Sequence, residues 1–319
     1  MALFADGATQ YLYVYVLGYS ESDGNSIMPL DIALPFYGDV AYMKKTVASV
    51  LAQTDPDWRL IVVDDGYPDD SLPDWFASLN DSRISYQRNE INLGANGNFR
   101  KCLGLVSEEF CVVMGADDIL EPDYVQQIHR AIRSHPDAAM IHPRVKVIDE
   151  NDNEVMTRAD RIKNKVHGSS ATDVELSGEL LAASLMRGNW MYFPSIAWRT
   201  REIKAIGFRE GFNVCQDLGL AMDVIMRGGV MVQIPESIFR YRRHLTSDSS
   251  AKALDGSRFI EERNFFSVME LELRNLGWKK ASRAARIHWT SRLHALSLLP
   301  KVRKSLSNLG TLAKHGLSI

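Results

Sequence analysis

The stretch from Arg59 to Gly66 constrains the fold of this chain more than any other segment. It reads RLIVVDDG, a short β-branched run that ends on two adjacent acids and a glycine. A buried parallel strand has this pattern when its carboxyl end opens into a ligand crevice. A second run of the same design, Phe110 to Met114, is followed by Gly115-Ala116-Asp117-Asp118. One such pair is often only a turn or a helix cap, but two pairs at one sheet edge favour a binding site.

Strands and helices alternate around these two runs. The pattern of apolar residues predicts strands at Asp31–Pro35, Arg59–Asp64, Arg83–Gln87, Phe110–Met114 and Ala139–His142, and helices at Val40–Gln53, Ser71–Leu79, Asn98–Leu105 and Pro122–Ser134. This alternation predicts an α/β fold with an open, mostly parallel central sheet flanked by helices.

The pattern changes after Arg144. Residues 1–30 are expected to form a leader, in which Tyr11–Leu17 could be an edge strand. From Ser257 onward we expect a C-terminal helical extension, interrupted at Gly277 and Pro300. Between Arg144 and Ser257 we expect a hairpin (Val145–Asp149 with Glu154–Thr157), a loop (Ala159–Val174), helices (Ser177–Arg187, Leu218–Arg227) and short strands (Tyr192–Trp198, Val230–Ile234, Ile238–Tyr241).

The composition is that of a globular protein in a reducing compartment. The three cysteines, Cys102, Cys111 and Cys215, are odd in number and lack paired spacing, which argues against a disulfide framework and a zinc site. The N-terminus lacks the basic cluster of a signal peptide, and no apolar run approaches the roughly 18 residues of a membrane span. We therefore expect a cytoplasmic protein.

The basic residues gather at the C-terminal end. The formal net charge is −3, but residues 275–319 contain five lysines, four arginines and no acid, so the rest of the chain carries −12. Apolar residues recur among them at helical spacing, from Trp278 to Leu299. An amphipathic basic helix suits the anionic inner face of a cell membrane, and it could equally pack on the main domain. The acidic body argues against nucleic acid as a partner.

At this point the chain resembles the family 2 glycosyltransferases, which have a GT-A fold. The resemblance runs from about Asp31 to Ser250, and its strength lies in eight segments that follow the family's order. They are DIALPFYG (31–38), SVLAQT (49–54), VVDDG (62–66), NLGANGNF (92–99), GADDILEPDY (115–124), IGFRE (206–210), CQDLGL (215–220) and YRRHLTS (241–247). The resemblance implies a GT-A domain at 31–250, with a nucleotide-sugar half (31–144) and an acceptor half (145–250), followed by the basic helical extension at 251–319.

The resemblance also implies where the donor binds. Pro35 and Tyr37 could form a wall for the base, and Asp65 could accept a hydrogen bond from a base N–H. Asn98 and Arg100 face the donor in the family picture. Tyr37 could instead be an ordinary surface aromatic, and Asn98 a helix N-cap.

Asp117 matches the family's metal-binding acid, the last residue of a D-x-D motif. Mg²⁺ or Mn²⁺ bound there would stabilise the charge that grows on the diphosphate leaving group. Gly115 stands where many members have the first aspartate, so one acid is missing. Asp118 is then expected to serve on the donor side, or merely to cap the turn.

Asp217 matches the catalytic base of the inverting members, which removes the proton of the acceptor hydroxyl. Gln216 replaces the acid that usually precedes it, and a helix-capping aspartate is the alternative interpretation. Arg242 and His244 match a segment that approaches the diphosphate, the arginine as a phosphate ligand and the histidine beside the metal. A basic surface turn would explain them equally.

The resemblance implies a nonprocessive, inverting, metal-dependent glycosyltransferase that uses a nucleoside-diphosphate sugar, most simply a UDP-sugar. Its acceptor would be a glycan or a lipid-linked hydroxyl. Trp190, Tyr192 and Phe193 lie where such enzymes bind acceptor, although aromatic residues near a strand often pack in the core. A non-catalytic glycan- or nucleotide-binding relative is the alternative, because Gly115 and Gln216 replace acids.

Overall fold

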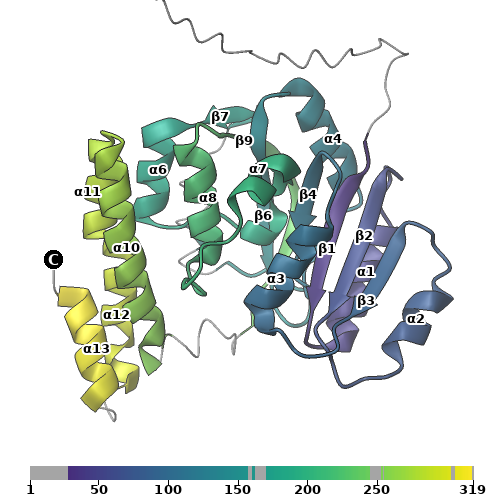
Figure 1. The fold of residues 1–319 in the computed structure, drawn as a ribbon, viewed down its shortest axis with the longest axis horizontal. Helices are drawn as coiled ribbons and strands as arrows, with labels where there is room; N and C mark the ends of the chain where they lie inside the picture. Colours follow the sequence, from purple (N-terminus) through teal and green to yellow (C-terminus); the bar gives the residue numbers. More distant parts are fainter. Residues whose placement is uncertain are drawn as a thin grey trace, which may run out of the picture.

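The computed structural model describes residues 28–156, 160–161, 170–244, 253, 255–302 and 306–317. In that part of the chain, nine strands form one sheet in the order β3-β2-β1-β4-β8-β6-β9-β5, with β7 paired to β9. Helices flank this sheet (Figure 1). The strands are β1 (Leu30–Phe36), β2 (Trp58–Asp64), β3 (Ile84–Arg88), β4 (Phe110–Val113), β5 (Ile119–Leu120), β6 (Ala138–Ile148), β7 (Val174–Leu176), β8 (Ala197–Arg199) and β9 (Val230–Arg242).

The first half of the sheet is parallel. β1 lies between β2 and β4, pairs with both in parallel, and β3 continues the parallel order beyond β2. The carboxyl ends of β1, β2 and β4 therefore meet at one edge, as the sequence predicted. Helices there are α1 (Val40–Leu51), α2 (Leu72–Ser78), α3 (Gly94–Leu105) and α4 (Tyr124–Ser134).

The second half of the sheet contains longer strands than predicted. β6 runs through Pro143, and β9 runs through Pro235, where the sequence analysis divided each strand in two. Proline cannot donate to the sheet ladder. The β6–β9 pairing shifts register around His142 and Arg144, so the prolines lie in irregularities and the strands continue past them. The predicted hairpin is present, because Ile148 bridges Glu154 and the Val155 N–H donates to Val147 O at 2.8 Å.

Several expectations for this half were wrong. The expected strand at Tyr192–Trp198 is a 3₁₀ turn, η1 (Phe193–Ser195), followed by the short strand β8. The chain does not break at Pro300, which lies inside a helix; the break is at His288, whose φ is 30°. The leader and most of the expected loop at 159–174 lie outside the described residues. Helices here are α6 (Gly178–Arg187), α7 (Thr200–Ile206), α8 (Gln216–Met226), α10 (Ser257–Asn275), α11 (Lys279–Ile287), α12 (Trp289–Val302) and α13 (Leu306–Leu317).

The C-terminal helices pack on the rest of the molecule. Figure 1 shows α10 to α13 together on the side of α8 that faces away from β1–β3. Phe265 and Met269 of α10 and Ala281 and Ala285 of α11 belong to the same buried apolar cluster as Leu220 of α8. α11 therefore packs on the main domain, which is one of the two alternatives that the sequence left open. None of the helices described is long and apolar enough to cross a bilayer.

Asp31 ties the parallel strands together at the edge opposite the site. Its carboxylate is fully buried and accepts hydrogen bonds from Arg59 Nε at 2.8 Å and from the backbone N–H groups of Ser107 and Glu108 at 2.6 and 2.9 Å. This one side chain joins β1, β2 and the turn before β4. Its removal would leave two backbone donors without their acceptor, and Arg59 with its contacts to Ser107 and Glu108.

We predict that Asp31→Ala lowers the free energy of unfolding by about 2–3 kcal/mol. The loss of a partner in a fully buried pair costs about 3–5 kcal/mol, and the cost is smaller here because the Arg59 side chain is 38% exposed. Urea denaturation measures the effect, with the exposed Asp74→Ala as a control. Equal midpoints for the two variants would contradict this role.

Candidate active site

The two acids at the end of β2 build the loop around them. Asp64 accepts hydrogen bonds from the Tyr67 N–H at 2.7 Å and the Tyr86 hydroxyl at 2.5 Å. Asp65 Oδ1 accepts from Asn89 Nδ2 at 2.7 Å and from the Leu93 N–H at 2.8 Å. Both carboxylates are buried, so each stabilises the backbone that forms this side of the site. The predicted contact of Asp65 with a base remains a prediction.

An aromatic wall stands above the carboxyl end of β1. Tyr37 is 58% exposed, and its ring meets the Tyr67 ring edge-on with centroids 5.6 Å apart. Pro35, two residues earlier in the chain and within β1, is half-buried. This arrangement leaves a flat apolar face available to a planar ring. Tyr67 escaped the sequence analysis because nothing in its local pattern distinguishes it from a turn residue.

Asn98 and Arg100 occupy different environments on α3. Asn98 is buried inside the helix, where Nδ2 donates to Val63 O at 2.8 Å and Oδ1 accepts from Asn89 at 3.2 Å. It is therefore neither the helix cap nor a residue open to a donor, and it joins α3 to β2. Arg100 is exposed.

The turn after β4 brings Asp117 and His244 together. His244 Nε2 lies 2.7 Å from Asp117 Oδ2, and the two side chains are 27% and 35% exposed. Asp118 points inward instead. Its Oδ1 accepts from the Arg242 N–H at 2.9 Å, whereas its buried Oδ2 has no hydrogen-bond partner among the residues described. Burial, and then the charge of Asp117, raises the pKa of Asp118 well above its ordinary value.

Gly115 leaves room for the two carboxylates that follow it in this turn. A Cβ atom at Gly115 would lie 2.6 Å from Asp118 Oδ2 and 2.8 Å from Asp117 Oδ1. Both distances are shorter than ordinary van der Waals contact, so the two carboxylates occupy the space that a side chain at position 115 would need. The glycine in place of the family's first acid therefore coincides with an inward-folded Asp118.

Asp117 and His244 could hold a divalent cation. Their Nε2 and Oδ2 atoms lie within hydrogen-bond distance, 2.7 Å, so the two side chains are close enough to approach one ion together. No group of three or more His, Cys, Asp or Glu side chains with metal-holding geometry occurs within the described ranges. An ion held by Asp117 and His244 would therefore need further oxygen ligands, which phosphate and water can supply.

Arg242 has a different role from the donor contact predicted for it. Its side chain is fully buried and forms an ion pair with Asp152 at 2.5 Å. Nε donates to Asp117 O and Nη1 to Asp149 O, each at 2.8 Å. The guanidinium therefore binds protein carbonyls and a carboxylate, and holds the 149–153 turn against the Asp117 turn.

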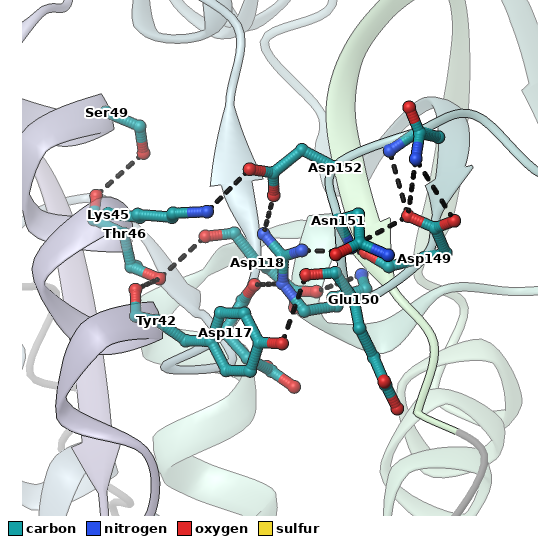
Figure 2. A network of polar contacts seen from close by, with 12 residues as sticks. Tyr42, Lys45, Thr46, Ser49, Asp117, Asp118, Asp149, Glu150, Asn151 and Asp152 are labelled. Carbon is teal, nitrogen blue, oxygen red and sulfur yellow. Dashed lines mark hydrogen bonds and ion pairs between the residues drawn. The ribbon is translucent and has the colours of Figure 1, made fainter.

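Figure 2 shows that α1 completes this network. Lys45 Nζ pairs with Asp152 Oδ2 at 2.6 Å, and the Tyr42 hydroxyl donates to Glu150 O at 3.1 Å. The Arg242 guanidinium lies over the Tyr42 ring, 4.5 Å from its centroid. Tyr42, Lys45 and Asp152 were not predicted as site residues, because the local pattern of an amphipathic helix or a polar turn does not indicate its long-range partners.

Asp217 lies in the first turn of α8 and is half-buried. Cys215 is the N-cap, but Asp217 Oδ1 accepts a hydrogen bond from the Leu218 N–H at 2.7 Å, so this carboxylate does satisfy a backbone donor of the first helical turn, as the capping alternative expects. Burial raises the pKa of the Tyr241 hydroxyl to about 12, and the charges of Asp118, Asp117 and Asp217 add to that increase. The charges of acids from two distant segments therefore act on one tyrosine, which was not predicted as a site residue from the sequence.

The aromatic residues considered for acceptor binding are in the core. Trp190, Tyr192 and Phe193 are 4%, 5% and 7% exposed. Tyr192 donates its hydroxyl to Asp160 at 3.0 Å, and Phe193 packs on Trp198. Core packing is therefore the correct interpretation of these three residues.

Comparison with known proteins identifies the class. The sequence profile of the family described as Glycosyl transferase family 2 matches residues 31–203, more than half of the chain. The chain belongs to this family. The resemblance inferred from the sequence is therefore confirmed, as is the α/β fold with its mostly parallel sheet.

Individual relatives are more distant. An uncharacterized protein of Mycobacterium tuberculosis is 24% identical over 250 residues, 75% of each chain. An uncharacterized glycosyltransferase of Nostoc is 24% identical over 56% of this chain and 53% of its own length. Chondroitin synthase of Escherichia coli is 25% identical over 79% of this chain but only 33% of its own. The chain thus spans about half and one third of the latter two.

The fold is also that of a solved structure. The crystal structure of S. aureus TarS 1-349 in complex with UDP-GlcNAc superposes with a TM-score of 0.66. It is 17% identical, and the match covers 90% of this chain and 81% of that one. At this identity the likeness shows the fold.

We predict that Arg242→Lys lowers the free energy of unfolding by about 2–3 kcal/mol. A lysine keeps the charge but cannot reach two carbonyls and a carboxylate in one plane, and each lost charged hydrogen bond costs about 1.5–3 kcal/mol. Arg240→Lys on the same strand is the control, because Arg240 is 36% exposed and pairs with Glu121 near the surface. Equal losses in urea denaturation would show that Arg242 does not join the two turns.

Proposed function

We propose that this chain transfers a single sugar, with inversion, from a UDP-sugar to a hydroxyl of a glycan or lipid-linked acceptor, using Mg²⁺ or Mn²⁺. The observation that carries the proposal is that Asp117 and His244 meet, with 2.7 Å between Oδ2 and Nε2, just beyond the carboxyl end of the parallel strand β4. Membership of the family supports sugar transfer as the reaction. The TarS structure of the same fold binds UDP-GlcNAc, which supports a UDP-linked donor.

The residues suit distinct steps. Tyr37 and Pro35 provide an apolar wall for a base, while Asp117 and His244 would hold the cation. The cation supplies charge stabilisation for the departing diphosphate. Asp217 would accept the proton of the acceptor hydroxyl as that oxygen forms its bond to the anomeric carbon. Its place in the first turn of α8 favours the carboxylate, because the helix N-terminus stabilises negative charge.

A non-catalytic nucleotide-binding relative is the second candidate. The missing first acid at Gly115 favours it, but the inward Asp118 occupies that space with a carboxylate. Wild-type protein that binds donor and never transfers sugar to any of a broad set of acceptors would support this candidate.

We predict that Asp117→Ala and Asp217→Ala separate binding from turnover. Asp117→Ala should weaken Mn²⁺-dependent binding of UDP-sugars, because it removes the carboxylate beside His244. Asp217→Ala should bind them nearly as well as wild type and lose about 10²–10⁴-fold in turnover, the usual contribution of a general base. Calorimetric titration with UDP-GlcNAc and related donors, beside a transfer assay, measures both.

Asp137→Ala is the matched control, since Asp137 is exposed and precedes β6 at the opposite edge of the sheet. If Asp217→Ala loses donor affinity as severely as Asp117→Ala, the role of base is misassigned. If wild-type protein binds no nucleotide sugar with either metal, the proposed function is wrong.

We also propose that the start of α12 meets the anionic inner face of the cell membrane. Trp289 and Leu293, one turn apart, are each 51% exposed. Arg283 and Arg286 of α11 are exposed just before them, and residues 275–319 contain no acid to oppose these charges. An exposed aromatic beside cations suits the headgroup region, and such a location would bring the enzyme to a lipid-linked acceptor.

We predict that the protein sediments with vesicles of phosphatidylglycerol and phosphatidylcholine, but not with phosphatidylcholine alone. Replacing both Trp289 and Leu293 by alanine should weaken binding by about tenfold or more, given roughly 1.5–3 kcal/mol for each large apolar side chain buried. Leu271→Ala is the control, because Leu271 is also 51% exposed but lies on α10. Unchanged sedimentation of the double variant would refute this surface.

A further inference from the structure

The N-terminal end of α8 is held by a side chain from the C-terminal helices. Glu261 of α10 places Oε1 2.5 Å from the Val214 N–H and 2.9 Å from the Cys215 N–H. Cys215 is the N-cap of α8 and makes no side-chain capping hydrogen bond. The carboxylate of Glu261 therefore binds, from 46 residues away, the N–H of the N-cap residue and the N–H before it, as the glutamate of a capping box does for the N-cap N–H.

The same helix contacts α8 at two further points. The Phe265 ring packs over Gly219, where a Cβ would lie 3.5 Å from Cε2 of the ring. Arg209 then joins Asp223 of α8 to Glu272 of α10, with Nη2 2.5 Å from Asp223 Oδ1 and 2.6 Å from Glu272 Oε2. α10 thus contacts α8 at several points along its length. The carboxylates of Asp223 and Glu272 bind Arg209, whereas the carboxylate of Glu261 binds the backbone just before Asp217.

We infer that Glu261 is a positioning residue for Asp217. Asp217 lies two residues beyond Cys215, so the orientation of the first turn of α8 sets the direction of its carboxylate. By fixing the two N–H groups before this turn, Glu261 fixes where the turn begins. This inference rests on the proposed function, in which Asp217 is the base.

The position of the base matters only when the acceptor reacts. A displacement of about 1 Å in a group that must meet a reacting atom can lower turnover roughly 10²-fold. Donor binding depends on the Asp117 turn and the wall at Tyr37, which Glu261 does not contact. The effect of Glu261 should therefore fall on kcat and leave nucleotide affinity unchanged.

Three substitutions at Glu261 test this role. Glu261→Ala removes the acceptor and should lower kcat by about 10–100-fold, with the Kd for UDP and Mn²⁺ unchanged. Glu261→Gln keeps an acceptor oxygen at the same reach without the charge, and should stay within about threefold of wild type. Glu261→Asp withdraws the carboxylate by one methylene and should be intermediate. Glu270→Ala, on the same helix, is the control and should retain wild-type kcat, because Glu270 pairs with Arg274 of α10 itself, at 4.0 Å.

Hydrogen exchange gives a readout that does not depend on turnover. The amides of Val214 and Cys215 should exchange faster in Glu261→Ala and remain protected in Glu261→Gln. If Glu261→Ala does not fold, Glu261→Asp and Glu261→Gln still give the comparison. Wild-type kcat in Glu261→Ala, or a Glu261→Gln variant as slow as Glu261→Ala, would overturn the inference. If the wild-type protein transfers no sugar, the proposed function is wrong instead. The exchange data then still test whether Glu261 holds the Val214 and Cys215 amides.

Discussion

The buried guanidinium of Arg242 organises the site. Arg242 is inaccessible to solvent, and burying a charge is very costly unless it is paired and hydrogen-bonded. Here the ion pair with Asp152, the two carbonyl acceptors and the Tyr42 ring meet that requirement. These partners come from the 149–153 turn, the Asp117 turn and α1. Since they all converge on one guanidinium, the position of Asp117 depends on residues more than a hundred positions apart in the chain.

The acids of the site fall into two groups, buried and partly exposed. Asp64, Asp65 and Asp118 are buried and accept hydrogen bonds from the backbone of the loops that surround them. Asp117 and Asp217 retain partial exposure at that edge. In the Asp117–Asp118 pair, therefore, one carboxylate shapes the turn and the other remains accessible to a ligand. The glycine at position 115 permits this division, because both carboxylates lie over it.

The C-terminal helices are part of the same physical unit. Their apolar residues continue the core of the second half, and Glu261 reaches the start of the helix that bears Asp217. Residues beyond the family-matched segment thus bear on the site. Their basic charges remain outward at Arg283 and Arg286, next to the exposed Trp289.

The parallel strands, the helices that alternate with them and the acids at the strand ends could all be predicted from the sequence, because buried strands and amphipathic helices have recognisable local periodicity. The sequence also indicated Asp117, His244 and Asp217 as site residues, and the structure brings the first two into contact. The folded structure was needed to show that Arg242 and Asn98 point inward, that Pro143 and Pro235 lie within continuous strands, and that Glu261 contacts the residues just before α8. Each of these depends on a partner far away in the chain, and local patterns do not record such partners.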